Sequence, residues 1–291
     1  MMKKNKTDAD LILSISKESF EGHFYDAKEK ERVVLTFSGS DGGSSASDTM
    51  AHYYKQNGIS ALGVTLFKGD ETGSDLDRIP LEYVENAISW LKGKGYERIA
   101  VDGISKGAEY ALLCAATFPD ITCVVARVPS YFVSEGMNGK KAPSGTSSWS
   151  YKNEEIPFVP YKVREFNVKK QFAKYKEFNI LEYNTGKGVT EKEIIPLEKI
   201  NGPILLLSTL KDTVWPSAEQ ADYIENYLKE RNFPHEVTNI KYSYISHFAI
   251  PMRKNTWLLK MLFKSERKYP SECAEERKDL TRKAIDFVAA S

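Results

Sequence analysis

The chain has 291 residues, of which 41% are hydrophobic and 28% charged, which is the composition of a soluble globular protein. Its 41 lysine and arginine residues nearly balance 40 acidic residues, which excludes the basic excess typical of proteins that bind nucleic acid or a membrane surface. No apolar run approaches the ~18 residues of a membrane-spanning helix. The three cysteines are widely spaced and odd in number, as in reducing compartments, so we predict a cytoplasmic protein.

Strand-like and helix-like segments alternate along most of the chain, which predicts a single domain (residues 1–291) built on a parallel sheet with helices on both faces. Continuous apolar runs indicate strands that are buried on both sides. Strands are expected at residues 19–26 (an edge strand), 32–37, 59–67, 98–102, 121–128, 203–207 and 237–242. Helices are expected around residues 50–54, from Pro80 at a first helical position to Gly93, at 108–116, from Pro216 onward, and at 273–288.

The alternation stops between residues 131 and 200, which therefore read as an insertion after the strand at 121–128. This segment is rich in aromatic residues and has a small excess of lysine and arginine over acidic residues. Two interpretations stay open: a surface excursion with its own small core, or a lid over the crevice at the strand ends.

Residues 103–107 (Gly-Ile-Ser-Lys-Gly) lie between a buried strand and a helix of small residues. A turn this sharp strains the backbone of its central residue and is tolerated when glycines flank it. A strand-to-helix turn of this kind is called a nucleophile elbow. It would place the Ser105 hydroxyl above the strand ends, beside the first amides of the following helix. Because the same pattern also occurs in ordinary turns, the hypothesis needs a base, an acid and oxyanion donors.

The base can be chosen by elimination among four histidines. His23 lies on an early strand, His52 within a helix, and His235 at the start of the last strand. Only His247 follows the carboxyl end of a strand, where ligands of parallel sheets bind. His247 is therefore the predicted general base, because that role needs a group that titrates near neutrality.

The predicted acid is Asp212, which follows the strand at 203–207 in a loop closed by Trp215 and Pro216. The competing carboxylates are Asp222, inside the next helix, and Asp102, inside the strand before the elbow. A loop aspartate before a helix also serves as an N-cap, so capping is the alternative role of Asp212. The order serine, aspartate, histidine is that of the α/β-hydrolases.

Backbone amides are expected to bind the oxyanion. One is the amide of Lys106, the residue after the nucleophile. The second is expected from the glycine-rich loop at 38–43, with Ser40 or Asp41 as the donor. A plain tight turn is the alternative for that loop, and a phosphate-binding loop is disfavoured because the lysine and serine ending of a P-loop is missing.

These motifs resemble the α/β-hydrolase superfamily and, within it, the C-terminal catalytic domain shared by acyl-CoA thioesterases and bile acid-CoA:amino acid N-acyltransferases, which is itself similar to dienelactone hydrolases. The resemblance rests on 35–43 (LTFSGSDGG), 103–109 (GISKGAE), 149–160 (WSYKNEEIPFVP), 196–216 (ending in LKDTVWP) and 246–251 (SHFAIP). It implies Ser105 as nucleophile, His247 as base and Asp212 as its partner.

The resemblance implies a serine hydrolase that cleaves acyl thioesters, such as acyl-CoA, through an acyl-enzyme on Ser105, with no metal or organic cofactor. A carboxylesterase or dienelactone-type hydrolase of small esters is one alternative. A second is an acyl-CoA acyltransferase, although the amino-acid-conjugating relatives use cysteine where this chain has Ser105. A catalytically inactive binding protein is the third. Nucleic acid and membranes are not expected as partners.

Overall fold

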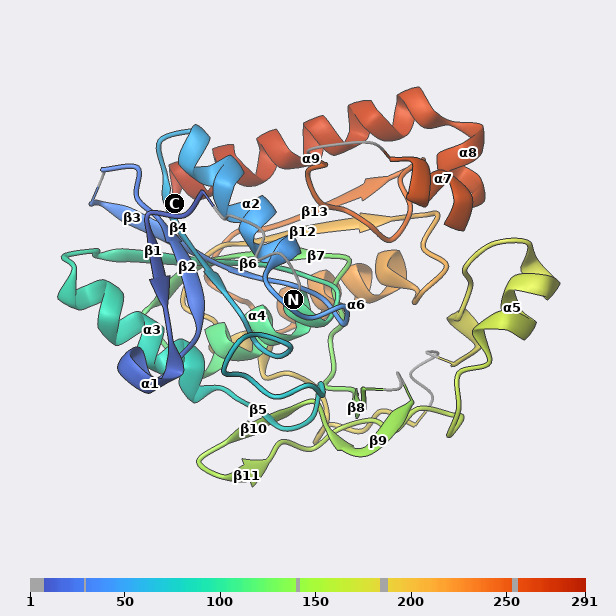
Figure 1. The fold of residues 1–291 in the computed structure, drawn as a ribbon, viewed down its shortest axis with the longest axis horizontal. Helices are drawn as coiled ribbons and strands as arrows, with labels where there is room; N and C mark the ends of the chain where they lie inside the picture. The colour runs from blue at the N-terminus through green and yellow to red at the C-terminus, as the bar shows by residue number, and fades with distance from the viewer. Residues whose placement is uncertain (1–7, 29, 140–141, 184–187, 253–255) are drawn as a thin grey trace.

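The structure is a computed structural model that describes residues 8–28, 30–139, 142–183, 188–252 and 256–291. Within these residues, eight strands form one twisted sheet in the order β1-β2-β4-β3-β6-β7-β12-β13 (Figure 1). Their bounds are β1 Leu11–Leu13, β2 Gly22–Tyr25, β3 Arg32–Phe37, β4 Ser60–Val64, β6 Arg98–Ile104, β7 Ile121–Arg127, β12 Ile204–Thr209 and β13 Val237–Tyr242. The pairs β1–β2 and β2–β4 are antiparallel, and the other pairs are parallel.

Helices cover both faces of the sheet. Helices α3 (Glu82–Gly93), α4 (Lys106–Thr117) and α6 (Ser217–Glu230) pack on one face. Helices α2 (Ser45–Gln56) and α9 (Pro270–Ala290) pack on the other, and Figure 1 shows α9 lying along the top of the sheet. Because successive strand residues point to opposite faces, a strand that is covered on both sides buries nearly all its side chains, as the continuous apolar runs predicted for β3 and β7.

The short helices are α1 (Ile15–Glu18), α7 (Trp257–Leu262) and α8 (Lys264–Lys268). In the part of the chain that the structure describes, no helix has the length and apolar character needed to cross a membrane.

The described residues of the segment 131–200 form small elements at the carboxyl-end side of the main sheet. These elements are β8 Glu135–Met137, β9 Pro143–Ser147, β10 Trp149–Tyr151, β11 Glu154–Glu155, α5 Val168–Tyr175, and the 3₁₀ turns Leu181–Tyr183 and Leu197–Lys199. Strands β8 and β9 pair with each other, while β10 lies between β11 and β5 (Ile79–Pro80). In Figure 1 the strands of this segment run along the lower edge of the molecule, and α5 projects at the right.

Two predictions about elements are wrong. Residues 22–25 are not an edge strand, because the three-residue β1, whose Leu11 and Ile12 are exposed, pairs with β2 on its outer side. Pro80 does not begin a helix: it pairs with Ser150 of β10, and α3 begins at Glu82. Both errors arise from long-range pairing that local signals do not report. The strands predicted at 32–37 and 237–242 are confirmed with the same bounds.

Candidate active site

Ser105 lies in a strained turn between β6 and α4. Its backbone has φ 60° and ψ −120°, outside the regions that residues with a side chain ordinarily adopt. Its amide donates a hydrogen bond to the carbonyl of Arg127 on the neighbouring strand (2.9 Å), and its carbonyl accepts from the amides of Ala108 and Glu109. The turn is therefore fixed from both sides, by the sheet and by the first turn of the helix.

The two flanking glycines are required by close packing. A Cβ atom at Gly103 would lie 2.0 Å from the carbonyl oxygen of Gly107. A Cβ atom at Gly107 would lie 2.5 Å from the carbonyl oxygens of Phe37 and Ser38, at the end of β3. Neither glycine has a positive φ, so the strain is confined to Ser105 itself. The glycines let strand, turn and helix approach closely enough to hold it.

A continuous chain of hydrogen bonds joins Ser105, His247 and Asp212. His247 Nε2 lies 2.9 Å from Ser105 Oγ, and Nδ1 lies 3.0 and 2.9 Å from the two carboxylate oxygens of Asp212. An ionised carboxylate only accepts, so Nδ1 carries the imidazole proton and Nε2 is left as the acceptor for the serine hydroxyl. All three residues are buried. The structure thus brings together the three residues that the sequence predicted to act as nucleophile, base and acid.

Asp212 does not cap a helix. Its Oδ1 accepts the amides of Val214 and Trp215 (2.9 and 3.2 Å), which closes the turn after β12, and the N-cap position of α6 is Pro216. These two amides also hold the carboxylate in place for His247. The indole of Trp215 packs edge-on against the imidazole, with ring centroids 5.2 Å apart.

The competing carboxylates have other partners. Asp102 forms a bidentate ion pair with the buried Arg127 guanidinium (2.8 Å for both contacts) and accepts the hydroxyl of Tyr54. Asp222 accepts from Asn239 and Lys241 on β13. Within the residue ranges that the structure describes, neither carboxylate is hydrogen-bonded to a histidine.

The other three histidines lie away from Ser105. His23, on β2, pairs with Asp48, and His52, in α2, pairs with Asp8. His235 precedes β13, at the opposite end of that strand from His247. Their placement agrees with the elimination made from the sequence.

The glycine-rich loop after β3 passes directly beside the elbow. A Cβ atom at Gly39 would lie 3.2 Å from the Cβ of Ser105, and Ser40 lines the same cavity as Ser105 and Lys106. Among the residues that the structure describes, none accepts a hydrogen bond from the amide of Ser40. The amide of Lys106 belongs to the first turn of α4, whose N–H groups have no partner within the helix. The carbonyl of Asp41 accepts from Lys68, and its side chain is exposed.

A cavity of about 290 Å³ opens above Ser105. Most of its lining is apolar, and residues 131–200 supply more than half of it. Its lining residues are Ser40, Ser105, Lys106, Met137, Tyr161, Phe166, Val168, Phe178, Ile180, Val214 and Trp215. An apolar cavity that has one polar floor can hold a hydrocarbon chain with its carbonyl group at the serine.

Sequence reasoning missed a set of buried charged residues around this site. Lys106 and Glu109 on α4, Arg127 on β7, and Glu266 with Arg277 on α8 and α9 are all buried. Burial lowers the pKa of the Lys106 ammonium, while the adjacent Glu109 carboxylate opposes that shift. One available signal was the occurrence of Lys106 and Glu109, three positions apart, in a helix that otherwise has small and apolar residues.

The cysteines do not offer a competing nucleophile. Cys114, Cys123 and Cys273 are free and buried, and burial raises the pKa of Cys123 and that of Cys273 to about 12. In the described part of the chain, no group of three or more histidine, cysteine, aspartate and glutamate side chains could hold a metal ion.

Comparison with known proteins finds the family that the sequence motifs resemble. Residues 79–252 match the family described as "BAAT / Acyl-CoA thioester hydrolase C terminal". Rat acyl-coenzyme A thioesterase 1 is 26% identical over 175 residues, which cover 59% of this chain and 38% of the rat protein. Mouse peroxisomal succinyl-coenzyme A thioesterase is 26% identical over 165 residues, 55% of this chain and 36% of that protein. The matched region thus spans well under half the length of these relatives.

Among solved structures, a putative dienelactone hydrolase from Klebsiella pneumoniae superposes with a TM-score of 0.56 at 15% identity, covering 94% of this chain and 93% of that one. At 15% identity, this similarity is evidence for the fold alone. Together with the mostly parallel sheet and its flanking helices, it confirms the α/β-hydrolase fold predicted from the sequence.

Proposed function

The chain belongs to the BAAT / acyl-CoA thioester hydrolase C-terminal family, and on that premise we propose that it is a serine hydrolase that cleaves acyl thioesters, such as acyl-CoA, through an acyl-enzyme on Ser105. The observation that carries this proposal is the hydrogen-bonded chain from Asp212 through His247 to Ser105, which ends on the floor of an apolar cavity. The thioesterase relatives support a thioester as the substrate.

In the proposed reaction, Ser105 Oγ attacks the acyl carbon while its proton passes to His247 Nε2. The carbonyl oxygen takes the negative charge and accepts hydrogen bonds from the amide of Lys106 and from that of Ser40 or Asp41. Collapse of this intermediate breaks the carbon–sulfur bond, and the leaving thiolate receives the proton from His247. Water then gives a proton to the same nitrogen while its oxygen attacks the ester carbon on Ser105. The bond between this carbon and Oγ breaks, His247 returns the proton to Oγ, and the carboxylic acid is released.

Asp212 would act by orientation and charge. Its carboxylate holds the proton on Nδ1, so that the imidazole always presents a lone pair to Ser105, and it stabilises the imidazolium that forms during each proton transfer. The apolar lining of the cavity excludes water from the acyl chain. It also strengthens the oxyanion contacts by lowering the local dielectric.

The experiment that tests this proposal has two parts. An alkyl fluorophosphonate should label the wild-type protein and leave Ser105→Ala unlabelled. Acyl-CoA thioesters and p-nitrophenyl esters of the same acyl chains should then be compared as substrates. Turnover of esters without any turnover of thioesters would favour a carboxylesterase or dienelactone-type hydrolase. Transfer to added glycine would favour an acyltransferase, and absence of labelling would favour an inactive binding protein.

We also propose that the chain is a single domain into which residues 131–200 are inserted, and that the protein is cytoplasmic. The location rests on the number and spacing of the cysteines, whereas one relative is named as peroxisomal. The cavity lining supports a role for the insertion in substrate binding, since Met137, Tyr161 and Phe166 all belong to it.

A further inference from the structure

We propose that the side chain of Lys106 ties the first part of the insertion, residues 134–139 and 142–166, to the nucleophile elbow, so that this part is a fixed wall of the acyl pocket that sets acyl-chain selectivity. This inference takes its acyl substrate from the proposed function. It assigns Lys106, Glu109, Glu135 and Arg164 as positioning residues, which act through the pocket wall.

The Lys106 ammonium is the first link. Its side chain is 1% exposed, and its ammonium group contacts residues of the insertion. Nζ donates to the hydroxyls of Ser134 and Ser148 (2.6 Å each) and lies within reach of the carbonyls of Ser134 and Glu135 (3.1 and 3.2 Å). An ammonium has three protons, so these acceptors saturate it. The residue that supplies an oxyanion amide with its backbone thus holds the insertion with its side chain.

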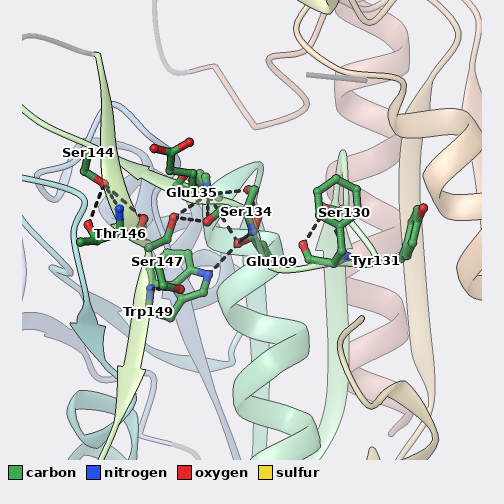
Figure 2. A network of polar contacts seen from close by, with 12 residues as sticks. Glu109, Ser130, Tyr131, Ser134, Glu135, Ser144, Thr146, Ser147 and Trp149 are labelled. Carbon is green, nitrogen blue, oxygen red and sulfur yellow. Dashed lines mark hydrogen bonds and ion pairs between the residues drawn. The ribbon is translucent and has the colours of Figure 1, made fainter. Parts of the chain in front are cut away.

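Glu109, one helical turn later, supplies the opposite charge. Its carboxylate is 0% exposed and lies 3.5 Å from Lys106 Nζ. It accepts the amide of Ser134 (2.9 Å), the hydroxyl of Ser134 (2.7 Å) and the indole N–H of Trp149 (2.7 Å). Figure 2 shows Ser134 and Trp149 both directed at Glu109 above the start of α4. Burying a charge costs several kcal/mol unless it is paired and hydrogen-bonded, so detaching the insertion would leave each of these two charges with only the other as a partner.

Glu135 carries the connection on to the residues that line the pocket. Its carboxylate is also fully buried, and it accepts the amides of Gly145 and Tyr161 (2.7 Å each) and a two-pronged contact from Arg164 (2.7 and 2.8 Å). Tyr161 lines the pocket, and its ring packs edge-on against Phe166, another lining residue, at 5.0 Å.

Met137 completes this part of the wall. It lies two residues after Glu135 in β8, lines the same cavity, and exchanges two backbone hydrogen bonds with Leu76 of the main body. Three lining residues, Met137, Tyr161 and Phe166, are therefore held in register with Ser105 by two buried acids and one buried lysine. A mobile lid would have to break these charge-assisted contacts each time it opened. The contacts therefore favour a fixed wall over a lid.

The first test is hydrogen exchange, which does not depend on catalysis. In the wild-type protein the amides of Ser134 and Glu135 should exchange as slowly as those in the middle of α4. In Lys106→Met they should exchange at least about tenfold faster, while amides of β3 keep their rates. Fast exchange at residues 134–135 in the wild type would overturn the inference, whatever the enzyme hydrolyses.

The second test is selectivity, measured as the ratio of kcat/KM for octanoyl over acetyl substrates. The side chain of Arg164 is 60% exposed, so its removal opens no cavity, but it leaves the buried Glu135 carboxylate without its cation. The ratio is therefore measured at a temperature at which urea unfolding shows that the variant is folded. In Arg164→Ala the ratio should fall about fivefold or more, mainly through the KM of the octanoyl substrate, because the wall residues shift by a fraction of an ångström. Arg164→Lys should restore only part of the ratio. It keeps the positive charge beside Glu135, but a lysine cannot form the two-pronged contact of the guanidinium.

The matched control is Arg282→Ala, which removes an arginine that is 69% exposed and paired with Asp279 on α9. This variant should keep the wild-type ratio. Equal losses on both substrates in Arg164→Ala would show a merely structural role and overturn the selectivity claim. If the wild type hydrolyses neither substrate, the proposed function fails, and the exchange experiment still decides whether the wall exists.

Discussion

Glu266 accepts two hydrogen bonds from Ser246, one from its amide (3.0 Å) and one from its hydroxyl (2.7 Å), and Ser246 immediately precedes His247. Arg277 of α9 forms a two-pronged ion pair with Glu266 and also donates to the carbonyl of Phe248 (3.2 Å). On the other side of the loop, Arg127 donates to the carbonyl of Ala249 (3.2 Å). The position of the imidazole above Ser105 is thus set by buried ion pairs on elements far away in the sequence.

The first prediction concerns this support. Glu266→Gln leaves the buried Arg277 without its counter-charge, so we expect a loss of about 3–5 kcal/mol in the free energy of unfolding. Because the His247 loop loosens, kcat should fall even at temperatures where the variant is folded. Urea denaturation and steady-state kinetics measure the two effects. Glu275→Gln removes a carboxylate that is 71% exposed on α9, the helix of Arg277, and it should change stability by less than about 0.5 kcal/mol.

The second prediction concerns the proposed acid. Asp212→Asn should lower kcat by about three to four orders of magnitude, because an amide no longer holds the imidazole proton on Nδ1. The fold should survive, since the side-chain oxygen of asparagine can still accept the amides of Val214 and Trp215. Asp222→Asn, which changes the competing carboxylate on α6, should keep nearly full activity. A strong loss in that variant together with a mild one in Asp212→Asn would contradict the assignment.

The third prediction concerns the elbow glycines. Gly103→Ala places a Cβ 2.0 Å from a backbone carbonyl oxygen that has no room to move, so we expect destabilisation of more than about 4 kcal/mol or failure to fold. Gly93→Ala is the matched control. A Cβ at that position, in the last turn of α3, meets nothing within 4 Å, so the substitution should stabilise the protein by about 0.5–1 kcal/mol. Thermal unfolding of both variants separates the two cases.

The fourth prediction concerns pH. The hydrogen bonds between His23 and Asp48 raise the pKa of His23 above its usual value of 6.5. The folded protein therefore binds this proton more tightly than the unfolded chain does. The pair's contribution to stability is complete below about pH 6.5 and is lost as the pH rises through the raised pKa.

Urea unfolding between about pH 5.5 and 8.5 measures this effect, since the window begins below the usual pKa of a histidine and extends well above it. In His23→Gln the decline in stability over this range should be smaller than in the wild type. His235→Gln, at the far end of β13 from His247, should keep the wild-type pH profile. An identical decline in wild type and His23→Gln would assign the pH dependence to other groups.

Much of the fold could be predicted because parallel strands buried on both faces are mostly apolar. In β12, Ile204 and Leu206 pack toward α4 and α6, while Leu205 and Leu207 pack toward α9, which accounts for the four apolar residues in a row that begin the strand. The same logic located the site residues. The chain reverses direction at the carboxyl ends of such strands, and Ser105, Asp212 and His247 each follow one of them.

Other features depend on contacts between residues far apart in the chain. The sequence could not show that β1 covers β2, or that Pro80 pairs with Ser150 of β10, since each needs a partner that local signals do not identify.

The ion pairs of Lys106, Arg127 and Glu266 were equally hidden, because a charged side chain is exposed by default and becomes buried only where tertiary structure supplies its partner. What the sequence alone determined, then, was the sheet, the elbow and the order of the three polar residues at the strand ends. The tertiary structure decided how these residues are held and what walls the pocket beside them, because buried charges are stable only where distant segments meet to pair them.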